Sequence, residues 1–471
     1  MTATPAARCG AAAGGLAHFG VVAWGMADVT PRPHADDEGS AAAAPAPSGT
    51  DPALAQVLSA KVAAALGGGR EAWTRRMFEA ATALRAAGGG PVFDLSLGNP
   101  SLEPPALWRA AIRELLADEP PGQHRYMTNA GFPEVRAFVA AREAARFGLP
   151  ITTDDVVMTV GAAGALAVLL RALVDPGEAV LVPAPYFAEY DAYAAYADAE
   201  LRTVGSRPDF GLDVAAIEAA LTADAAAGGA VRVLLLNSPN NPTGAVYDAT
   251  ELAALAAALE RVSARRRAAG QLRPLVVLED SPYRDLLHDG SAAPSLMPHW
   301  RSTIHVTSHS KDLGLAGERI GYLVVSPALE GRAAVARAAA YCNRVLGFVN
   351  APALMQRALP RVLGQPGGSV DVGVYARHCA TLAAALVELG FALQPPRAGF
   401  FLFPQIPVAW RERHGDQADV ALATALLDAR CVVVPGVAFG MPGHLRIAVC
   451  VDEATITGAV AALRAVVPHV A

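Results

Sequence analysis

Lysine is nearly absent from this chain, while arginine is common. Lys61 and Lys311 are the only lysines in a 471-residue sequence that holds 38 lysine and arginine residues together. A guanidinium group stays protonated and cannot condense with a carbonyl group, whereas a lysine amine can. A lysine retained in such a sequence is therefore a candidate for amine chemistry, although a surface lysine is the simpler interpretation of either residue taken alone.

The sequence also lacks the features that several classes of ligand require. Its formal net charge is −6 and its pI is about 6.0, so no basic field attracts a phosphate backbone, and nucleic acid is not an expected partner. No Gly-Lys dipeptide occurs, which excludes a Walker A loop. The 11 histidines show no His-Glu-x-x-His or other metal spacing, and no metal site is predicted.

Cysteines are few, and long apolar runs are missing. The five cysteines are scattered and form no Cys-x-x-Cys pair, which fits neither a disulfide framework nor a zinc site and predicts a reducing cytoplasm. No apolar run reaches the roughly 18 residues of a membrane span, so no membrane is expected as a partner. The stretch GGLAHFGVVAWGMA resembles a signal-peptide core, but only Arg8 precedes it, so secretion is the less favoured alternative.

From about residue 130, helix-like stretches alternate with short apolar runs. The runs are rich in valine and leucine throughout: VVMTV, AVLVP, VRVLLLN, PLVVLED and TIHVTS. Continuous apolar strands are typical of a parallel sheet that helices cover on both faces. We therefore expect an α/β fold with a mostly parallel, doubly wound sheet.

Changes in composition predict the domain organisation. Residues 1–50 are rich in alanine, glycine and proline and are expected to form a disordered leader. Residues 126–349 hold the alternating pattern and are the expected large domain. Residues 350–471 join helical stretches to alternating segments such as GFFLFPQIP, which predicts a smaller α+β domain. The N-terminal segment 51–125 is expected to complete that smaller domain.

Polar, aromatic and small residues follow each predicted strand. They occupy positions 161–164, 186–187, 237–241, 280–283 and 308–311. Ligands bind at the carboxyl ends of the strands in open parallel sheets. Nearly every group able to do chemistry is therefore predicted to lie at one edge of the sheet.

Two of these residues suggest a cofactor. Lys311 can form an imine with an aldehyde, and Asp280 ends an apolar strand, where an ionised carboxylate needs a cationic partner. The pyridinium nitrogen of pyridoxal 5′-phosphate is the partner that a Schiff-base lysine predicts. Taken alone, Asp280 also suits a turn or a helix cap.

A phosphate site is predicted where GAAGAL, residues 161–166, opens a helix directly after a strand. Free backbone N–H groups and the helix dipole face any group above such a turn. Arg319 and Ser308 are candidates for a countercharge and a hydroxyl contact. A tight strand-to-helix turn and a surface salt bridge are the alternatives for these features.

With these residues in place, the chain resembles the class I/II aminotransferases, which are fold-type I pyridoxal-phosphate-dependent enzymes. The resemblance covers roughly residues 73–455. It rests on the following motifs, in the family's order: RRMFEAA, LSLGNPSLEPP, YMTNAGFPEVR, TVGAAGAL, VPAPYFAEY, NSPNNPTG, DSPYR, SHSKDLGLAGERIGY, NRVLGFVNAPALMQR, GFFLFP and VPGVAFGMPGHLRIAV. It implies the family's fold, with a large cofactor-binding domain and a smaller domain.

The resemblance implies roles at the cofactor ring. Lys311 is expected to hold pyridoxal phosphate and to move the proton between the substrate α-carbon and the cofactor. Asp280 is expected to keep the ring nitrogen protonated. Asn241 and Tyr283 match residues that hydrogen-bond the ring hydroxyl, and Phe187 matches the residue that stacks on the ring.

The remaining roles concern the phosphate and the substrate. The implied phosphate contacts are the amides of Ala162 and Ala163, together with Ser308 and Arg319. Tyr126 matches a position that reaches the phosphate of the neighbouring subunit, which implies a homodimer with shared active sites. The implied contacts of the substrate α-carboxylate are Arg446, Gly98 and Asn99.

The function implied is transfer of an amino group from an L-amino acid to a 2-oxo acid in a ping-pong cycle, with aspartate and 2-oxoglutarate as the first pair to test. DSPY in place of DEPY, the missing proline in GLAGERIG, and Gln405 in place of a frequent lysine leave substrate choice open.

A second hypothesis keeps the cofactor but ends in elimination, replacement, oxidation or carbon–carbon bond formation through the same quinonoid. A third, a ligand-sensing regulator, needs a DNA-binding module that residues 1–72 do not display.

Overall fold

A computed structural model of the protein describes residues 57–66, 72–118 and 121–467, and these residues belong to one compact unit. The predicted leader, residues 1–50, lies outside the described residues. Within them, no helix is both long enough and apolar enough to cross a membrane.

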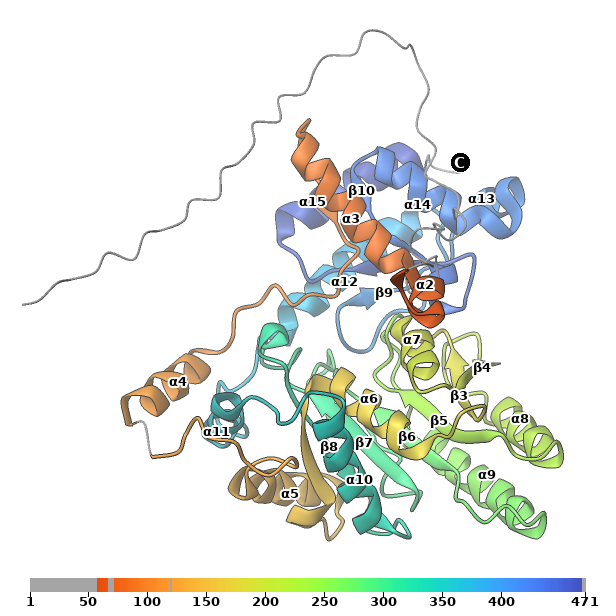
Figure 1. The fold of residues 1–471 in the computed structure, drawn as a ribbon. Helices are drawn as coiled ribbons and strands as arrows, with labels where there is room; N and C mark the ends of the chain where they lie inside the picture. The colour runs from red at the N-terminus through yellow and green to blue at the C-terminus, as the bar shows by residue number, and fades with distance from the viewer. Residues whose placement is uncertain (1–56, 67–71, 119–120, 468–471) are drawn as a thin grey trace, which may run out of the picture. The chain divides into compact units, whose positions relative to one another are not determined.

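The centre of the fold is a seven-stranded sheet with the order β2-β8-β7-β6-β5-β3-β4 (Figure 1). Its strands are β2 (Val156–Val160), β3 (Ala179–Ala184), β4 (Glu200–Gly205), β5 (Val231–Asn237), β6 (Val276–Asp280), β7 (Thr303–Ser308) and β8 (Ile320–Val325). Only β8 is antiparallel to its neighbours, β2 and β7, and the other pairs are parallel. The mostly parallel α/β sheet predicted from the sequence is confirmed.

Helices cover both faces of this sheet. One face packs against α6 (Gly161–Leu173), α7 (Glu189–Tyr196) and α10 (Arg332–Val345). The other packs against α5 (Pro133–Phe147), α8 (Val214–Ala226), α9 (Ala249–Ala268), α4 (Ala106–Asp118) and α11 (Ala353–Val362). In β5, Val233 and Leu235 enter the first layer, and Leu234 and Leu236 enter the second. This two-sided burial explains why consecutive positions of a central strand, and not only alternate ones, are apolar in runs such as residues 233–236.

Local signals in the sequence set where the helices begin and end. α5 starts with Pro133 at its first turn and stops at Gly148, which adopts the left-handed conformation at φ 64°. α9 begins with a capping box, in which the Asp248 carboxylate accepts from the Glu251 amide and the Glu251 carboxylate accepts from the Asp248 amide. Such caps satisfy backbone groups that a helix end leaves without partners.

Two small sheets lie in the remaining part of the unit. Strand β1 (Phe93–Asp94) pairs in parallel with β10 (Cys431–Val432), and β11 (Val434–Pro435), β12 (Leu445–Ala448) and β9 (Phe401–Leu402) form an antiparallel sheet. They pack with α3 (Ala72–Ala87), α12 (Val372–Glu388), α14 (Ala418–Asp428) and α15 (Glu453–Val466) (Figure 1). The short helices α2 (Ala60–Leu66) and α13 (Val408–His414) complete the described elements of this kind.

The segments that precede and follow the large sheet in the sequence contribute both to the small sheets and to the helices beside the large sheet. Strand β1 joins β10, whereas α4 packs against α11 beside the large sheet. The predicted boundaries at residues 126 and 350 stay predictions, because the described residues form one compact unit. Within the large sheet, strands β4 and β8 were not among the predicted strands.

Parallel β3, β5, β6 and β7 end at the same edge of the sheet, and Asn237, Asp280 and Ser308 are the last residues of three of them. The small sheet that contains β9 and β12 contributes Phe401 and Arg446 to the same region. The topology thus directs chemically active side chains to one place.

Candidate active site

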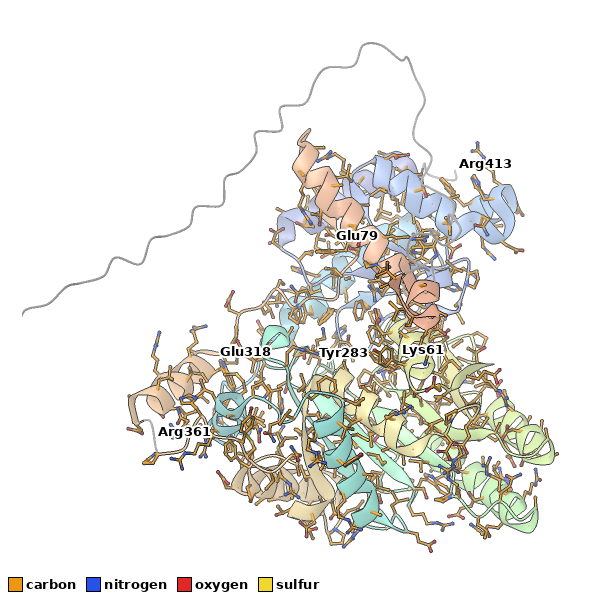
Figure 2. The ribbon with its side chains drawn as sticks, viewed as in Figure 1. Lys61, Glu79, Tyr283, Glu318, Arg361 and Arg413 are labelled. Carbon is orange, nitrogen blue, oxygen red and sulfur yellow. The ribbon has the colours of Figure 1, made fainter. Side chains whose placement is uncertain are left out.

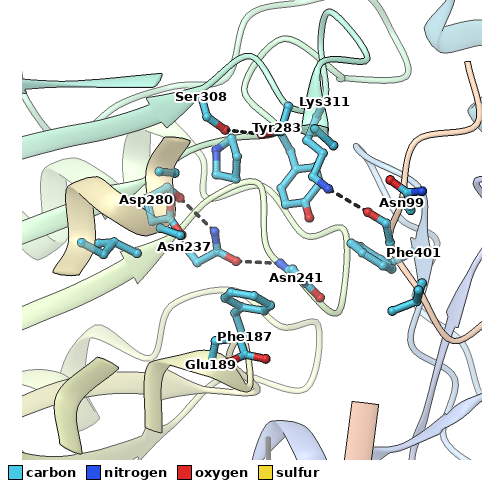
Figure 3. A pocket seen from close by; sticks show the side chains of 18 of the residues that line it. Asn99, Phe187, Glu189, Asn237, Asn241, Asp280, Tyr283, Ser308, Lys311 and Phe401 are labelled. Atoms are coloured by element: carbon cyan, nitrogen blue, oxygen red, sulfur yellow. Dashed lines mark hydrogen bonds between the residues drawn. The ribbon is translucent and has the colours of Figure 1, made fainter. Parts of the chain in front are cut away.

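A cavity of about 380 Å³ lies at the carboxyl ends of the strands (Figure 3). Every predicted site residue except Tyr126 lines it: Gly98, Asn99, Ala162, Ala163, Phe187, Asn241, Asp280, Tyr283, Ser308, Lys311, Arg319 and Arg446. These residues come from segments more than 300 positions apart in the sequence. The fold therefore concentrates them in one pocket.

Lys311 projects into this cavity from the loop after β7. Its Nζ donates a hydrogen bond to the Gly98 carbonyl oxygen at 2.7 Å and faces the rings of Tyr283 and Phe400 at 5.9 and 5.4 Å from their centroids. Burial disfavours the ammonium form and lowers the pKa of Lys311 to about 8. Its amine therefore becomes a neutral nucleophile at a lower pH than that of an ordinary lysine.

The other lysine has different surroundings. Lys61 lies in α2 (Figure 2). Its ammonium group pairs with the Asp198 carboxylate at the protein surface, where both side chains are more than 40% exposed. It stands apart from the cavity that contains Lys311. Of the two lysines, only Lys311 combines burial with a lining position in a pocket.

Asp280 is a buried carboxylate with only one of its two oxygens hydrogen-bonded. Its Oδ2 accepts a hydrogen bond from the Tyr190 hydroxyl at 2.6 Å, whereas Oδ1 has no hydrogen-bond partner among the described residues. Burial raises the pKa of Asp280 to about 7, and the Tyr190 hydrogen bond opposes that rise. A cation near Oδ1 would stabilise the ionised form.

The start of α6 forms a cradle of small residues. Gly161 has φ 68°, and a Cβ atom there would lie 3.0 Å from Nη2 of Arg319. Arg319 is held in turn by a 2.9 Å hydrogen bond from Nη1 to the Ala316 carbonyl oxygen. Ala162 and Ala163 follow Gly161 at the helix N-terminus. Backbone N–H groups, a helix dipole and a guanidinium group in one place suit an anion.

Two asparagines connect the ends of β5 and β6. Asn237 Nδ2 donates to the Asp280 carbonyl oxygen at 2.9 Å, and Asn237 Oδ1 accepts from the Asn241 amide at 2.7 Å (Figure 3). Burial raises the pKa of the nearby Tyr283 phenol, so its hydroxyl stays protonated and able to donate. Phe187 packs against Tyr190 with ring centroids 5.5 Å apart. Asn241, Tyr283 and Phe187 therefore line the same cavity, the first two with polar groups and the third with an aromatic ring.

Arg446, in β12, is a further cation of the cavity wall. Its guanidinium lies between the rings of Phe401 and Phe439, 5.0 and 4.7 Å from their centroids, and Nη2 donates to the Ser96 carbonyl oxygen. Burial lowers the pKa of Arg446 to about 10, which still leaves it charged at neutral pH. The lack of a side chain at Gly98 leaves room for the Phe401 ring, since a Cβ at position 98 would come within 2.4 Å of Phe401 Cζ.

Comparison with known proteins agrees with this geometry. The model of the family "Aminotransferase class I and II" matches residues 90–463. The chain belongs to this family. Class I and II aminotransferases depend on pyridoxal 5′-phosphate, so this protein is a pyridoxal-phosphate-dependent aminotransferase whose substrates are amino acids and oxo acids.

Named relatives and solved structures resemble this aminotransferase over most of their length. The aspartate/prephenate aminotransferase of Thermus thermophilus is 28% identical over 364 residues, 76% of this chain and 86% of the relative. The aspartate aminotransferase of Streptomyces avermitilis is 29% identical, over 84% of this chain and 94% of the relative. A crystal structure of an aminotransferase from Eubacterium rectale has a TM-score of 0.77 and 30% identity, covering 87% and 98% of the two chains. The Thermus thermophilus aspartate aminotransferase with maleate has a TM-score of 0.74 and 27% identity, covering 87% and 99%.

The residues of this aminotransferase fit pyridoxal phosphate. Asp280 Oδ1, buried and without a partner among the described residues, is an acceptor for a protonated ring nitrogen. The small residues at the start of α6, which a single Cβ at Gly161 would crowd, leave room for a phosphate beside Arg319. Lys311 supplies the amine that such an aldehyde requires.

Tyr126 is the predicted site residue that lies elsewhere. Its side chain is 90% exposed and borders a surface hollow with Arg125, Phe348 and Asn350. The role implied for Tyr126 belongs to a second subunit, so its absence from the cavity of its own chain does not test that role.

Sequence reasoning missed several residues of the cavity. Tyr190 contacts Asp280 directly, and Asn237 joins Asp280 to Asn241. Glu189 and Thr74 line the cavity as well. Asn237 carried a usable signal, because it ends a predicted strand next to two selected positions. Tyr190 and Glu189 lie in the quoted motif PYFAEY, but the direction in which they point depends on the turn into α7.

Proposed function

We propose that this aminotransferase uses Lys311 as the residue that binds the cofactor and moves the proton at the substrate α-carbon. The observation that carries this proposal is a half-buried amine with a lowered pKa that lines the same cavity as Asp280 and Arg446. Pyridoxal phosphate supplies the electron sink when it is bound. The amine supplies the base, and its pKa of about 8 suits proton transfer near neutral pH.

The surrounding side chains take complementary roles in this proposal. Asp280 holds a proton on the ring nitrogen through its second carboxylate oxygen. Asn241 and Tyr283 donate to the ring hydroxyl, and Phe187 covers one face of the ring. Each of these residues lines the cavity, which supports the assignment.

The phosphate and the substrate carboxylate are assigned to two different groups of lining residues. We assign the phosphate to the amides of Ala162 and Ala163, the hydroxyl of Ser308 and the guanidinium of Arg319. Arg446 binds the substrate α-carboxylate as a two-pronged donor, a contact in which arginine is preferred to lysine. Its fixed position between two aromatic rings supports this role. Gly98 and Asn99 lie beside that carboxylate.

The scarcity of lysine gives a direct test. Borohydride reduction of the holoenzyme, followed by peptide mass spectrometry, is expected to leave the cofactor's mass on the peptide of Lys311 and none on that of Lys61. Lys311→Ala is expected to abolish turnover of every amino acid, whereas Lys61→Ala retains it. Cofactor attached to Lys61, or turnover by Lys311→Ala at the unaltered rate, would contradict the proposal.

We further propose a homodimer that shares its active sites, located in the cytoplasm. Exposed Tyr126, Tyr341 and Val345 offer apolar surface of the kind that interfaces cover, and the described cysteines are all unpaired. Sedimentation of the holoenzyme is expected to give twice the chain mass. Mixing Tyr126→Ala with Lys311→Ala subunits tests the sharing, because a mixed dimer can assemble one site in which both residues are intact. Fractionation of the source cells tests the location.

A further inference from the structure

Two titratable side chains are buried in neighbouring strands of the large sheet, outside the cavity. Glu279 in β6 and His305 in β7 are paired across the two strands, and both side chains are almost fully buried. Neither residue is among the described residues that line the cavity. A buried polar group is costly unless it has a partner, so the contacts of this pair need a physical account.

His305 joins Glu279 to Arg284. Its Nδ1 lies 2.9 Å from Oε2 of Glu279, and its Nε2 lies 2.9 Å from Nη1 of Arg284. A guanidinium group only donates, so Nε2 of His305 must accept, and the single proton of the neutral imidazole is on Nδ1, which donates it to Glu279. A second proton on Nε2 would set two donors against each other. We call these three residues the His305 clasp.

Both ends of the clasp are held by further hydrogen bonds. Glu279 also accepts a hydrogen bond from the Ser295 hydroxyl. Arg284 donates to both carboxylate oxygens of Glu143 and to the Tyr322 hydroxyl. With the bond to the imidazole, all four protons on the two terminal nitrogens of Arg284 have an acceptor. A buried network in which every member is satisfied favours a single rigid arrangement.

The clasp holds the chain on both sides of the segment that carries two residues assigned to the cofactor ring. Glu279 directly precedes Asp280 in the sequence. Arg284 directly follows Tyr283. Because consecutive side chains of a strand point to opposite faces of the sheet, Asp280 can line the cavity while Glu279 is held behind it. The clasp therefore fixes the backbone from which Asp280 and Tyr283 reach the cavity.

We propose that His305 is a positioning residue, which in its neutral form with the proton on Nδ1 holds Asp280 and Tyr283 in the orientation that the ring of pyridoxal phosphate requires. The inference rests on the proposed function, because it takes these two side chains as contacts of the ring. The phosphate cradle at the start of α6 is not part of the clasp. Loss of the clasp therefore weakens the binding of the ring and leaves the binding of the phosphate intact.

Replacement of His305 by leucine and by glutamine tests this role. His305→Leu removes both hydrogen bonds, whereas His305→Gln keeps a donor and an acceptor in a neutral side chain. Because a misplaced Asp280 loses a hydrogen bond between charged groups, His305→Leu is expected to bind pyridoxal phosphate about 10-fold to 100-fold more weakly. Fluorescence titration of the apoproteins measures this affinity. Calorimetry is expected to show that the affinity for inorganic phosphate is unchanged, and His305→Gln is expected to recover most of the affinity for the cofactor.

Val324→Ala is the matched control for packing. Val324 pairs with His305 across β7 and β8 and is fully buried, but its side chain has no polar atom. The control is expected to lose stability in urea and to keep its affinity for both ligands. Equal losses of both affinities in His305→Leu would show that the residue acts through packing alone and would overturn the proposal. Unchanged affinities, or no recovery in His305→Gln, would overturn it as well.

The position of the proton can be tested without a variant. Neutron diffraction from crystals of the holoenzyme is expected to show deuterium on Nδ1 of His305 and none on Nε2, and deuterium on Nε2 overturns the proposal. The proposed function is judged separately. If Lys311→Ala keeps its turnover while His305→Leu loses affinity for the cofactor alone, the role of Lys311 fails and the clasp stands. If Lys311→Ala is inactive and His305→Leu binds the cofactor normally, the clasp fails alone.

Discussion

The Tyr190 hydroxyl donates a 2.6 Å hydrogen bond to Oδ2 of Asp280 from a helix 90 positions earlier in the chain. Both residues are buried, and Oδ1 of Asp280 remains without a partner among the described residues. A carboxylate held on one side by a neutral donor is oriented but not neutralised. Tyr190 therefore directs the second oxygen of Asp280 toward the cavity and leaves its charge for another group.

The first prediction concerns the pH dependence of the apoprotein. The pKa of Asp280 is raised from its ordinary value of 3.8 to about 7 in the folded state, so the folded protein keeps a proton that the unfolded chain loses. Stability is therefore expected to fall as pH rises from about 4 to about 7, by on the order of 4 kcal/mol, and to level off above that range. Urea denaturation of the apoprotein and of Asp280→Asn across this range measures the difference.

Two controls make that measurement specific. Asp280→Asn cannot ionise, so its stability is expected to lack this component of the fall. Tyr190→Phe removes a hydrogen bond that favours the carboxylate, so the fall is expected to continue above pH 7. Identical pH profiles for the unaltered protein and Asp280→Asn would contradict the prediction.

The second prediction concerns Lys311 in the apoprotein. Its pKa of about 8 leaves about half of the side chains neutral at pH 8, roughly 100 times the neutral fraction of an ordinary lysine. The rate at which a small acylating reagent modifies Lys311 is expected to rise with pH and to reach half its maximum near pH 8. Mass spectrometry of the peptide containing Lys311 follows the reaction without interference from other lysine side chains, because Lys61 lies in a different peptide. A midpoint near pH 10 would show that burial does not lower the pKa.

The third prediction separates crowding from backbone strain at the phosphate cradle. Gly161 and Gly177 both have positive φ, 68° and 86°, so replacement by alanine strains each backbone by about 1 kcal/mol. A Cβ at Gly161 meets Arg319, whereas one at Gly177 meets nothing within 4 Å. Gly161→Ala is expected to weaken cofactor binding at least about 10-fold, since Arg319 must move. Fluorescence titration of the apoproteins with pyridoxal phosphate tests this.

Gly177→Ala is the matched control for the same measurement. It is expected to lose a similar amount of stability in urea and to bind the cofactor as the unaltered protein does. Equal losses of cofactor affinity in the two variants would assign the effect to strain and contradict a role for Gly161 in the cradle.

The strands of the large sheet could be predicted from the sequence where a continuous apolar run matched burial on both faces. Apolar runs such as VRVLLLN predicted strands with both faces covered, and the structure places their alternate residues in two core layers. The aminotransferase function was predicted as well, because the motifs occur in a fixed order along the chain. The family comparison confirms that function.

Two strands of the large sheet were missed for different physical reasons. β4 is an edge strand whose residues are exposed or half-buried, so ELRTVG has no continuous apolar run. β8 is fully buried, but its sequence IGYLVV directly follows Arg319, and the motif SHSKDLGLAGERIGY was interpreted only for its site residues and not as the start of a strand. The place of β8 as an antiparallel strand between β2 and β7 depends on long-range pairing that local patterns do not contain.

The cavity wall contains a further part that local patterns cannot predict. Glu189 and Tyr190 are adjacent in the sequence, yet one lines the cavity and the other reaches Asp280 behind it. Only the packing of α7 against the sheet separates these two directions. Selectivity depends on such directions, which is why the motifs predicted the reaction but left the substrate open.

The last prediction concerns the buried ion pair that supports the loop after β6. Arg284, next to Tyr283, donates to both carboxylate oxygens of Glu143 at 2.8 and 2.7 Å and to the Tyr322 hydroxyl at 2.7 Å. The Arg284 charge holds the pKa of Glu143 well below its usual range despite burial. Glu143 therefore stabilises the fold above the pKa of the unfolded chain, and that stability is lost as pH falls.

Removal of one partner is expected to cost more than removal of both. Arg284→Met removes both hydrogen bonds that the buried Glu143 carboxylate accepts from Arg284 and leaves it with the more distant guanidinium of Arg142, at 3.8 Å. This variant is expected to have a free energy of unfolding that is lower by about 3 kcal/mol at pH 7. Combining it with Glu143→Gln removes the unpaired charge and is expected to recover part of that loss. Urea denaturation of the holoenzyme and its variants measures both effects. A double variant less stable than Arg284→Met would contradict the prediction, because the Tyr322 hydrogen bond and the Arg142 charge would then outweigh the cost of the buried carboxylate.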